Sequence, residues 1–211
     1  MLKKIEREKL LLGSLGLAYG LFALTFRGPR TQFWNRMMLT GLTLGGLSLK
    51  TQPRLRKTRI GPKDVGLGLA SAAGLYVVFK IGDRIARVIM PKGASEIDDI
   101  YALRRLGDKR AIAARLVSII GPAEELYWRG VVQHRLMDLF GKPLGAVLGT
   151  AAYGGAHLVT GNFTLIGAAS VAGGYWGALY ALGVPTGALI VSHAAWDVFI
   201  FLIAPTVAQE D

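Results

Sequence analysis

Residues 184–204, VPTGALIVSHAAWDVFIFLIA, form an apolar run that contains a single charged side chain, Asp197. A helix of roughly 20 predominantly apolar residues is long enough to cross the hydrocarbon core of a bilayer. The run therefore predicts a membrane-spanning helix. An Asp at the centre of such a helix costs roughly 2.5–3.5 kcal/mol on insertion scales, so Asp197 is a candidate functional residue.

Further apolar runs precede this one, and the composition of the whole chain agrees with them. They span residues 10–26, 34–49, 65–81, 144–159 and 163–182. The chain has 211 residues, of which 52% are hydrophobic, and a mean hydropathy of +0.39. We therefore predict an all-α fold, a polytopic transmembrane helical bundle of about six to eight spans with the active site inside the bundle. A large soluble helical bundle, the alternative, would need more polar helix faces than these runs offer.

Polar residues divide the chain into three parts of one integral membrane domain. Residues 1–83 are predicted to form the N-terminal membrane spans, residues 84–110 a polar loop or surface helix, and residues 111–211 a catalytic helical block. Within the polar part, SEIDDIYALRRL (95–106) favours an amphipathic surface helix whose charged side chains form a solvated face.

The net charge of +11 is unevenly distributed, because every Lys and Arg lies at or before Lys142. The basic segment 50–63 indicates a cytoplasmic loop, so we expect a cytoplasmic N-terminus and a hairpin of the first two spans. Residues 84–110 mix both signs and leave the orientation of the later spans open. We expect a prokaryotic plasma membrane as the setting. The expected partners are the lipid bilayer and a peptide or protein substrate, with no nucleic acid.

Glycines recur every four residues in the last part of the chain. One series is Gly141, Gly145 and Gly149, and the next is Gly173 and Gly177. Small residues at this spacing let membrane helices approach closely, so we interpret all of them as packing positions.

Polar residues four positions apart occur in pairs within the apolar segments, and such residues lie on one face of a helix. The pairs are Glu125 with Arg129, Tyr153 with His157, and His193 with Asp197. Taken singly, each pair has a structural interpretation, such as an intrahelical ion pair, a hydrogen-bonded core histidine or a contact that locks two helices. Their co-occurrence predicts instead one central pocket that contains all of them.

The stretch GPAEELYWRG (121–130) places two adjacent glutamates in this pocket. Glu124 lies about 100° round the helix from Glu125, because an α-helix turns once per ~3.6 residues. One glutamate can therefore face the cavity while the other pairs with Arg129, and we expect Glu124 to face the water. His134 stands near the end of its helix, and we assign it to the membrane interface.

This inventory suits the hydrolysis of an amide by activated water. A carboxylate and a histidine that converge on one water form a general-base pair, and a nearby arginine can keep a buried glutamate ionised. A second histidine across the pocket can donate to a developing oxyanion. The chain has no cysteine, so a thiolate nucleophile is not indicated. It also has no H-E-x-x-H pattern of zincins and no G-x-S-G pattern of intramembrane serine proteases.

Three short motifs resemble those of a known family. EELYWR (124–129) resembles the E-E-x-x-x-R motif of the CPBP family, the CAAX-protease and bacteriocin-processing intramembrane endopeptidases of Abi/Rce1-like type. YGGAH (153–157) resembles the second motif, an aromatic residue followed after three positions by His. HAAWD (193–197) resembles the third, H-x-x-x-N/D, and the resemblance covers residues 111–205 approximately.

The resemblance implies a glutamate-dependent intramembrane endopeptidase that needs no cofactor or metal. By analogy Glu124 and His157 would activate the water. Arg129 with Glu125 would orient the first glutamate. The implied catalytic residues are Glu124, Glu125, Arg129, His157, His193 and Asp197.

The chain departs from the family pattern at two of these motif positions. Tyr153 replaces the commoner Phe and adds a hydroxyl group. Asp197 replaces the Asn of the prenyl-protein proteases, and an ionised Asp cannot donate a hydrogen bond to an oxyanion. We therefore expect His193 to stabilise the oxyanion and Asp197 either to be protonated or to orient His193.

Other functions use the same residues. His157, His193 and a glutamate are acceptable zinc ligands, so a metal-dependent version of the protease is one alternative. A non-catalytic scaffold, an immunity or chaperone-like partner, or a proton-linked transporter is another, because buried Glu, His and Asp also form proton relays.

Overall fold

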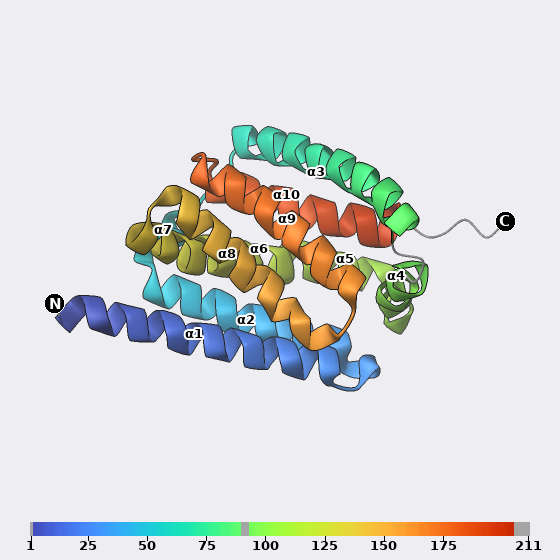
Figure 1. Cartoon of the computed structure of the whole chain (residues 1–211), viewed down its shortest axis with the longest axis horizontal. Coiled ribbons are helices and arrows are strands. Elements are labelled where there is room, and N and C mark those ends of the chain that lie inside the picture. The colour runs from blue at the N-terminus through green and yellow to red at the C-terminus, as the bar shows by residue number, and fades with distance from the viewer. Residues whose placement is uncertain (1, 90–92, 205–211) are drawn as a thin grey trace.

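The computed structural model describes residues 2–89 and 93–204, and within these ranges the regular structure is entirely helical (Figure 1). The predicted all-α fold is confirmed. Residues 205–211, the end of the predicted catalytic block, lie outside the described residues.

The first two helices form the hairpin that the sequence predicted. α1 (Leu2–Arg27) and α2 (Phe33–Thr51) lie side by side in Figure 1, and the short 3₁₀ helix η1 (Arg30–Gln32) joins them. The turn begins at Pro29, which caps η1 and has no N–H to offer to a continuing helix.

The next helices differ from the predicted boundaries. After η2 (Pro53–Lys57), α3 (Pro62–Ile89) continues past residue 83 into the segment predicted as polar loop. α4 (Gly93–Tyr101) and the 3₁₀ helix η3 (Ala102–Leu106) follow, within the segment where the sequence predicts a polar loop or surface helix. The extension of α3, RIARVI (84–89), contains no Gly or Pro, and its Ala and Arg are among the better helix formers.

A chain of helical segments follows, each continuing directly into the next. The segments are α5 (Lys109–Arg115), η4 (Leu116–Ile120), α6 (Gly121–Glu124), η5 (Glu125–Gln133) and α7 (His134–Phe140). Both η4 and η5 have π-helical hydrogen bonding, which no pattern in the sequence indicated. Nearly all of η5 is buried, since α2, α8 and α10 pack around it.

The remaining helices cover this central segment. They are α8 (Lys142–Ala156), η6 (His157–Thr160), α9 (Phe163–Ala181), α10 (Thr186–Val198) and the π-helical η7 (Phe199–Ile203). Figure 1 shows α3 running along α10 on one side of the molecule and the α1–α2 hairpin on the other. The site residues therefore lie on helices enclosed between these two layers.

The glycine series are packing positions with one exception. A Cβ at Gly145 would clash with Met137 Cα, and one at Gly149 would lie 2.9 Å from Gln133 Cβ. Gly173 and Gly177 likewise lie close to side chains of neighbouring helices. The interpretation is wrong for Gly141, where a Cβ would meet nothing within 4 Å; this residue has φ +81° and forms the turn before α8.

Three helical segments among the described residues are long and apolar enough to cross a membrane: Glu8–Arg27, Pro62–Gly82 and Thr186–Ile203. α8 has 15 residues and is shorter than a span, and α2 and α9, with 19 residues each, are not among these three segments. An integral membrane protein is supported, and the predicted number of six to eight spans stays a prediction.

Candidate active site

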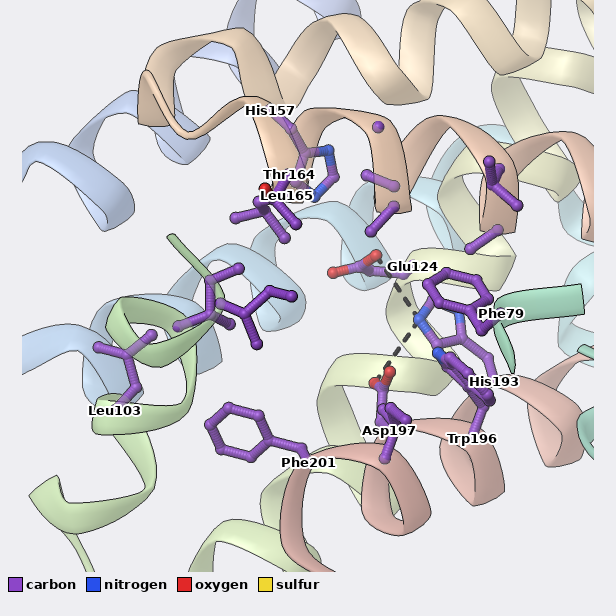
Figure 2. Close-up of a pocket in the computed structure, with 18 of the residues that line it drawn as sticks. Phe79, Leu103, Glu124, His157, Thr164, Leu165, His193, Trp196, Asp197 and Phe201 are labelled. Carbon is purple, nitrogen blue, oxygen red and sulfur yellow. Dashed lines mark ion pairs between the residues drawn. The ribbon is translucent and has the colours of Figure 1, made fainter. Parts of the chain in front are cut away.

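A cavity of about 500 Å³ lies between the helices, and most of its wall is aliphatic or aromatic. Helices from α1 to α4 contribute apolar side chains, and so do α9 and α10. The ionisable side chains of the wall are gathered together, as Figure 2 shows for its labelled residues. They are Glu124, His157, His193 and Asp197, with Tyr101 and Tyr153 as the phenols of the lining.

Glu124 is the last residue of α6 and lines the cavity. Its Oε2 accepts a hydrogen bond of 2.9 Å from the Tyr153 hydroxyl and lies 3.9 Å from His193 Nε2. Its Oε1 accepts no hydrogen bond from the described residues. One carboxylate oxygen is therefore held, and the other is free to meet a molecule in the cavity.

Glu125 begins η5 and is fully buried, outside the cavity lining. Its Oε1 accepts a hydrogen bond of 2.9 Å from Arg129 Nη1 and another of 2.7 Å from His193 Nδ1. Its Oε2 is buried and has no hydrogen-bond partner among the described residues. Glu125 thus connects the arginine to the histidine behind the cavity wall.

Arg129 is also buried outside the lining, with 1% of its surface exposed. Besides Glu125 it binds the carbonyl oxygen of Gly173 at 3.1 Å through Nη2. Its guanidinium lies over the rings of Tyr153 at 4.8 Å and Trp176 at 5.4 Å, within the range of cation–π attraction. These contacts join η5 to α8 and α9.

His157 lines the cavity at the start of η6, directly after α8. Its Nδ1 lies 3.0 Å from the backbone carbonyl oxygen of Tyr153. Since a carbonyl oxygen only accepts, Nδ1 carries the proton, and the neutral ring has its lone pair on Nε2. The rings of Phe22 and Phe26 contact the imidazole at 5.3 and 5.9 Å and hold its plane.

His193 and Asp197 lie on α10, and both line the cavity. The His193 ring stacks on Trp176, with centroids 4.0 Å apart and planes at 18°. Because Nδ1 donates to the carboxylate of Glu125, the second nitrogen faces the cavity, 3.5 Å from Asp197 Oδ2. Figure 2 shows His193 between Glu124 and Asp197, with both contacts dashed.

Comparison with known proteins found a family that is similar to the part of the chain that contains these residues. Residues 108–199 match a family model described as Rce1-like, type II CAAX prenyl endopeptidase Rce1-like. These residues, fewer than half of the chain, are similar to the Rce1-like family. The resemblance seen in the three motifs is thereby confirmed, and it supports a CAAX-type membrane protease, hence a peptidase. No curated protein and no solved structure matches the chain.

The Rce1-like block contains every site residue that the sequence predicted, but the structure places them in two groups. Glu124, His157, His193 and Asp197 line one cavity, as expected of a central pocket. The Glu125–Arg129 pair lies behind the wall, and Glu125 contacts His193 directly. Glu124 thus lines the cavity, whereas Glu125 pairs with Arg129 behind the cavity wall.

Residues that the sequence motifs did not single out complete the surroundings of the Rce1-like site. Trp176 stacks on His193 and donates from Nε1 to Ser192 at 2.9 Å, and Ser192 in turn donates to Ser71 of α3 at 2.9 Å. The signal in the sequence is an indole within the glycine-rich stretch AGGYWG (172–177). The glycine spacing explains why helices approach each other there, but it does not predict which side chain the indole contacts.

The polar segment before the Rce1-like block takes part in the cavity wall. Asp98 and Asp99 of α4 are exposed, as expected of a solvated face. Glu96 instead accepts hydrogen bonds from the backbone N–H of Thr164 at 2.8 Å and from its hydroxyl at 2.6 Å. These hydrogen bonds lower the pKa of Glu96 below its ordinary value, and they hold α4 against the start of α9. Ile97 and Ile100 of α4 line the cavity.

His134 lies outside the cavity lining. Its Nδ1 lies 3.1 Å from the hydroxyl of Tyr180, and Nε2 lies 4.0 Å from Asp138 Oδ2. Burial and the neighbouring Arg54 lower the pKa of His134. Within the described part of the chain, no three His, Asp or Glu side chains are grouped as ligands for a metal ion.

Proposed function

We propose that the chain is an intramembrane endopeptidase that hydrolyses a peptide bond in a membrane-associated or lipidated peptide or protein. The observation that carries the proposal is the environment of Glu124. This carboxylate lines an apolar cavity with one oxygen free, and His157 and His193 line the same cavity. Such a cavity accepts an apolar substrate and keeps bulk water away from the reacting groups.

In the proposed reaction Glu124 and His157 activate one water molecule. Glu124 Oε1 takes a proton from the water, and the lone pair on His157 Nε2 accepts the other O–H as a hydrogen bond. The oxygen attacks the carbonyl carbon of the scissile peptide bond. The proton held by Glu124 then passes to the leaving nitrogen, so that water and peptide give one carboxylic acid and one amine.

His193 is proposed to stabilise the oxyanion that forms on the carbonyl oxygen. Its Nδ1 donates to Glu125, so Nε2 can donate only when the ring is an imidazolium. Asp197, 3.5 Å from Nε2, is then a counter-charge that orients the ring. This geometry favours the orienting role for Asp197 over the direct donor role of an asparagine. Glu125 and Arg129 fix His193 from behind.

We also propose that the N-terminus and the loop around η2 lie in the cytoplasm of a prokaryotic cell. The basic residues of segment 50–63 support this orientation through the positive-inside rule.

The direct test replaces Glu124 by glutamine in the full chain, purified in detergent and reconstituted in liposomes. The substrate is an internally quenched peptide that ends in a farnesylated CAAX sequence, together with its non-prenylated counterpart. Loss of a general base lowers kcat by about 10²–10⁴-fold, and we expect a loss of this size. Asp138→Asn, the same chemical change at a half-exposed site outside the cavity, should cleave at the wild-type rate.

Each other outcome identifies an alternative. Cleavage by Glu124→Gln at the wild-type rate refutes the proposed mechanism. Activity that disappears with a chelator and returns with zinc supports the metal-dependent version instead. If neither the prenylated nor the plain peptide is cleaved, and Glu124→Gln keeps co-purifying a partner, the scaffold interpretation gains support.

A further inference from the structure

Tyr153 contacts both groups that the proposed mechanism uses to activate water. Its hydroxyl donates to Glu124 Oε2 at 2.9 Å, and its backbone carbonyl oxygen accepts from His157 Nδ1 at 3.0 Å. The first contact leaves Glu124 Oε1 free, and the second leaves the lone pair of His157 on Nε2. A single residue of α8 therefore sets the direction of both proton acceptors.

We propose that Tyr153 is a positioning residue for the water-activating pair. Through its hydroxyl it fixes the rotation of the Glu124 carboxylate. The proposal rests on the proposed role of Glu124 as the general base. It assigns a function to the hydroxyl group, which is absent from the phenylalanine that is more common at this motif position.

The Tyr153 ring is held on several sides, so the hydroxyl cannot easily turn away. Trp128 meets the ring edge-to-face at 5.4 Å, and the guanidinium of Arg129 lies 4.8 Å over it. On a further side a Cβ at Gly173 would come within 2.6 Å of Tyr153 Cδ1, so only glycine leaves room for the ring. Buried to 6% exposure, the phenol is fixed by packing before any substrate binds.

The hydroxyl restricts the Glu124 carboxylate to one rotation, which keeps the free oxygen directed at the water. Removing the hydroxyl should therefore lower kcat and leave the binding of the substrate in the cavity unchanged.

Tyr153→Phe isolates the hydroxyl, since the ring and its packing remain. We expect kcat to fall about 10- to 100-fold, as for a hydrogen bond to a charged group, with KM for the farnesylated peptide changed by less than about twofold. The matched control is Tyr127→Phe, which removes a fully buried hydroxyl bonded to Ser14 at 3.2 Å and lying outside the cavity lining. The kinetics of this control should match those of the wild type.

A second variant tests whether the hydroxyl acts as a hydrogen-bond donor. Fluorotyrosine at position 153 keeps both the shape and the donor, so it should cleave at close to the wild-type rate. A merely structural role predicts that Tyr153→Phe also keeps the wild-type kcat, and this result would overturn the proposal.

The two variants separate this inference from the proposed function. A wild-type kcat in Tyr153→Phe overturns the inference even when Glu124→Gln is inactive, whereas an active Glu124→Gln refutes the proposed function whatever the kcat of Tyr153→Phe.

Discussion

The ion pair behind the cavity wall offers a sharp test of how the site is held together. Replacing Arg129 by methionine keeps much of the buried side-chain volume but removes the charge. Arg129 is 1% exposed and Glu125 is fully buried, so no solvent can take the place of the guanidinium at 2.9 Å from Glu125 Oε1. The variant leaves a buried carboxylate with His193 as its remaining hydrogen-bond donor.

The magnitude follows from this arrangement. Removing one partner of a buried ion pair typically costs about 3–5 kcal/mol, because the other charge is left without compensation. His193 still donates to Glu125 at 2.7 Å, so we expect the lower end, about 3 kcal/mol. That loss corresponds to roughly a 100-fold change in the ratio of folded to unfolded protein. For a chain of this size it lowers Tm by about 6–12 °C.

Thermal unfolding of the purified protein in detergent, followed by the fluorescence of its 4 tryptophans, measures this change. The control is the double variant Glu125→Gln/Arg129→Met, which removes both charges. Removing both partners of a buried pair costs much less than removing one, so the double variant should recover most of the lost Tm. The reasoning is refuted if Arg129→Met unfolds at the wild-type temperature, or if the double variant is no more stable than the single one.

Two further predictions concern the cavity and the helix that covers part of it. Gly167 lines the cavity, and a Cβ added there would meet nothing within 4 Å. Gly167→Leu should therefore raise KM for the farnesylated peptide about tenfold with no change in Tm. The control is Gly13→Leu, at a position that is equally open but outside the lining, and it should leave KM unchanged. An unchanged KM in Gly167→Leu would place substrate binding elsewhere. The pKa of Glu96 is lowered in the folded chain, so its contact with Thr164 stabilises α4 at pH values above the ordinary pKa of glutamate. This stabilisation is lost as the pH falls through the lowered pKa. Hydrogen exchange of α4, corrected for intrinsic rates, should be faster at acidic than at neutral pH in the wild type. In Glu96→Gln the two rates should be equal. Equal rates in the wild type would contradict this prediction.

The sequence was sufficient for the parts of the site that depend on local spacing. Residues four apart on a helix share a face, and this spacing alone pairs His193 with Asp197 and Glu125 with Arg129. The family motifs then add the order of the helices. Long-range partners have no such signal: Glu125 meets His193 across 68 positions of the chain, and two carboxylates were equally available to it.

The contribution of α4 to the cavity could not be read from the sequence either. A helix with alternating charges and isoleucines suits a solvated surface and a cavity lid equally well, because both present one polar and one apolar face. What decides between them is the pairing of Glu96 with the start of α9, a contact between residues far apart in the chain. The span count is similarly undetermined, since length and hydropathy describe a helix without its neighbours.

Helix type explains how two identical neighbours come to occupy different environments. Pro122 stands inside the continuous segment from α5 to α7 and has no N–H to donate, so the ladder of hydrogen bonds must change around it. The chain is π-helical before it, α-helical for Gly121–Glu124, and π-helical again from Glu125. The change of winding therefore falls between the two glutamates, at the point where one side chain enters the cavity and the next enters the dry interior. Adjacent carboxylates, one lining the cavity and one in the packed interior, are suited to different roles, a division that environment rather than residue type creates. On this argument Pro122→Ala, by restoring a regular helix, should disturb the Glu124 position more than any substitution of equal size on α1.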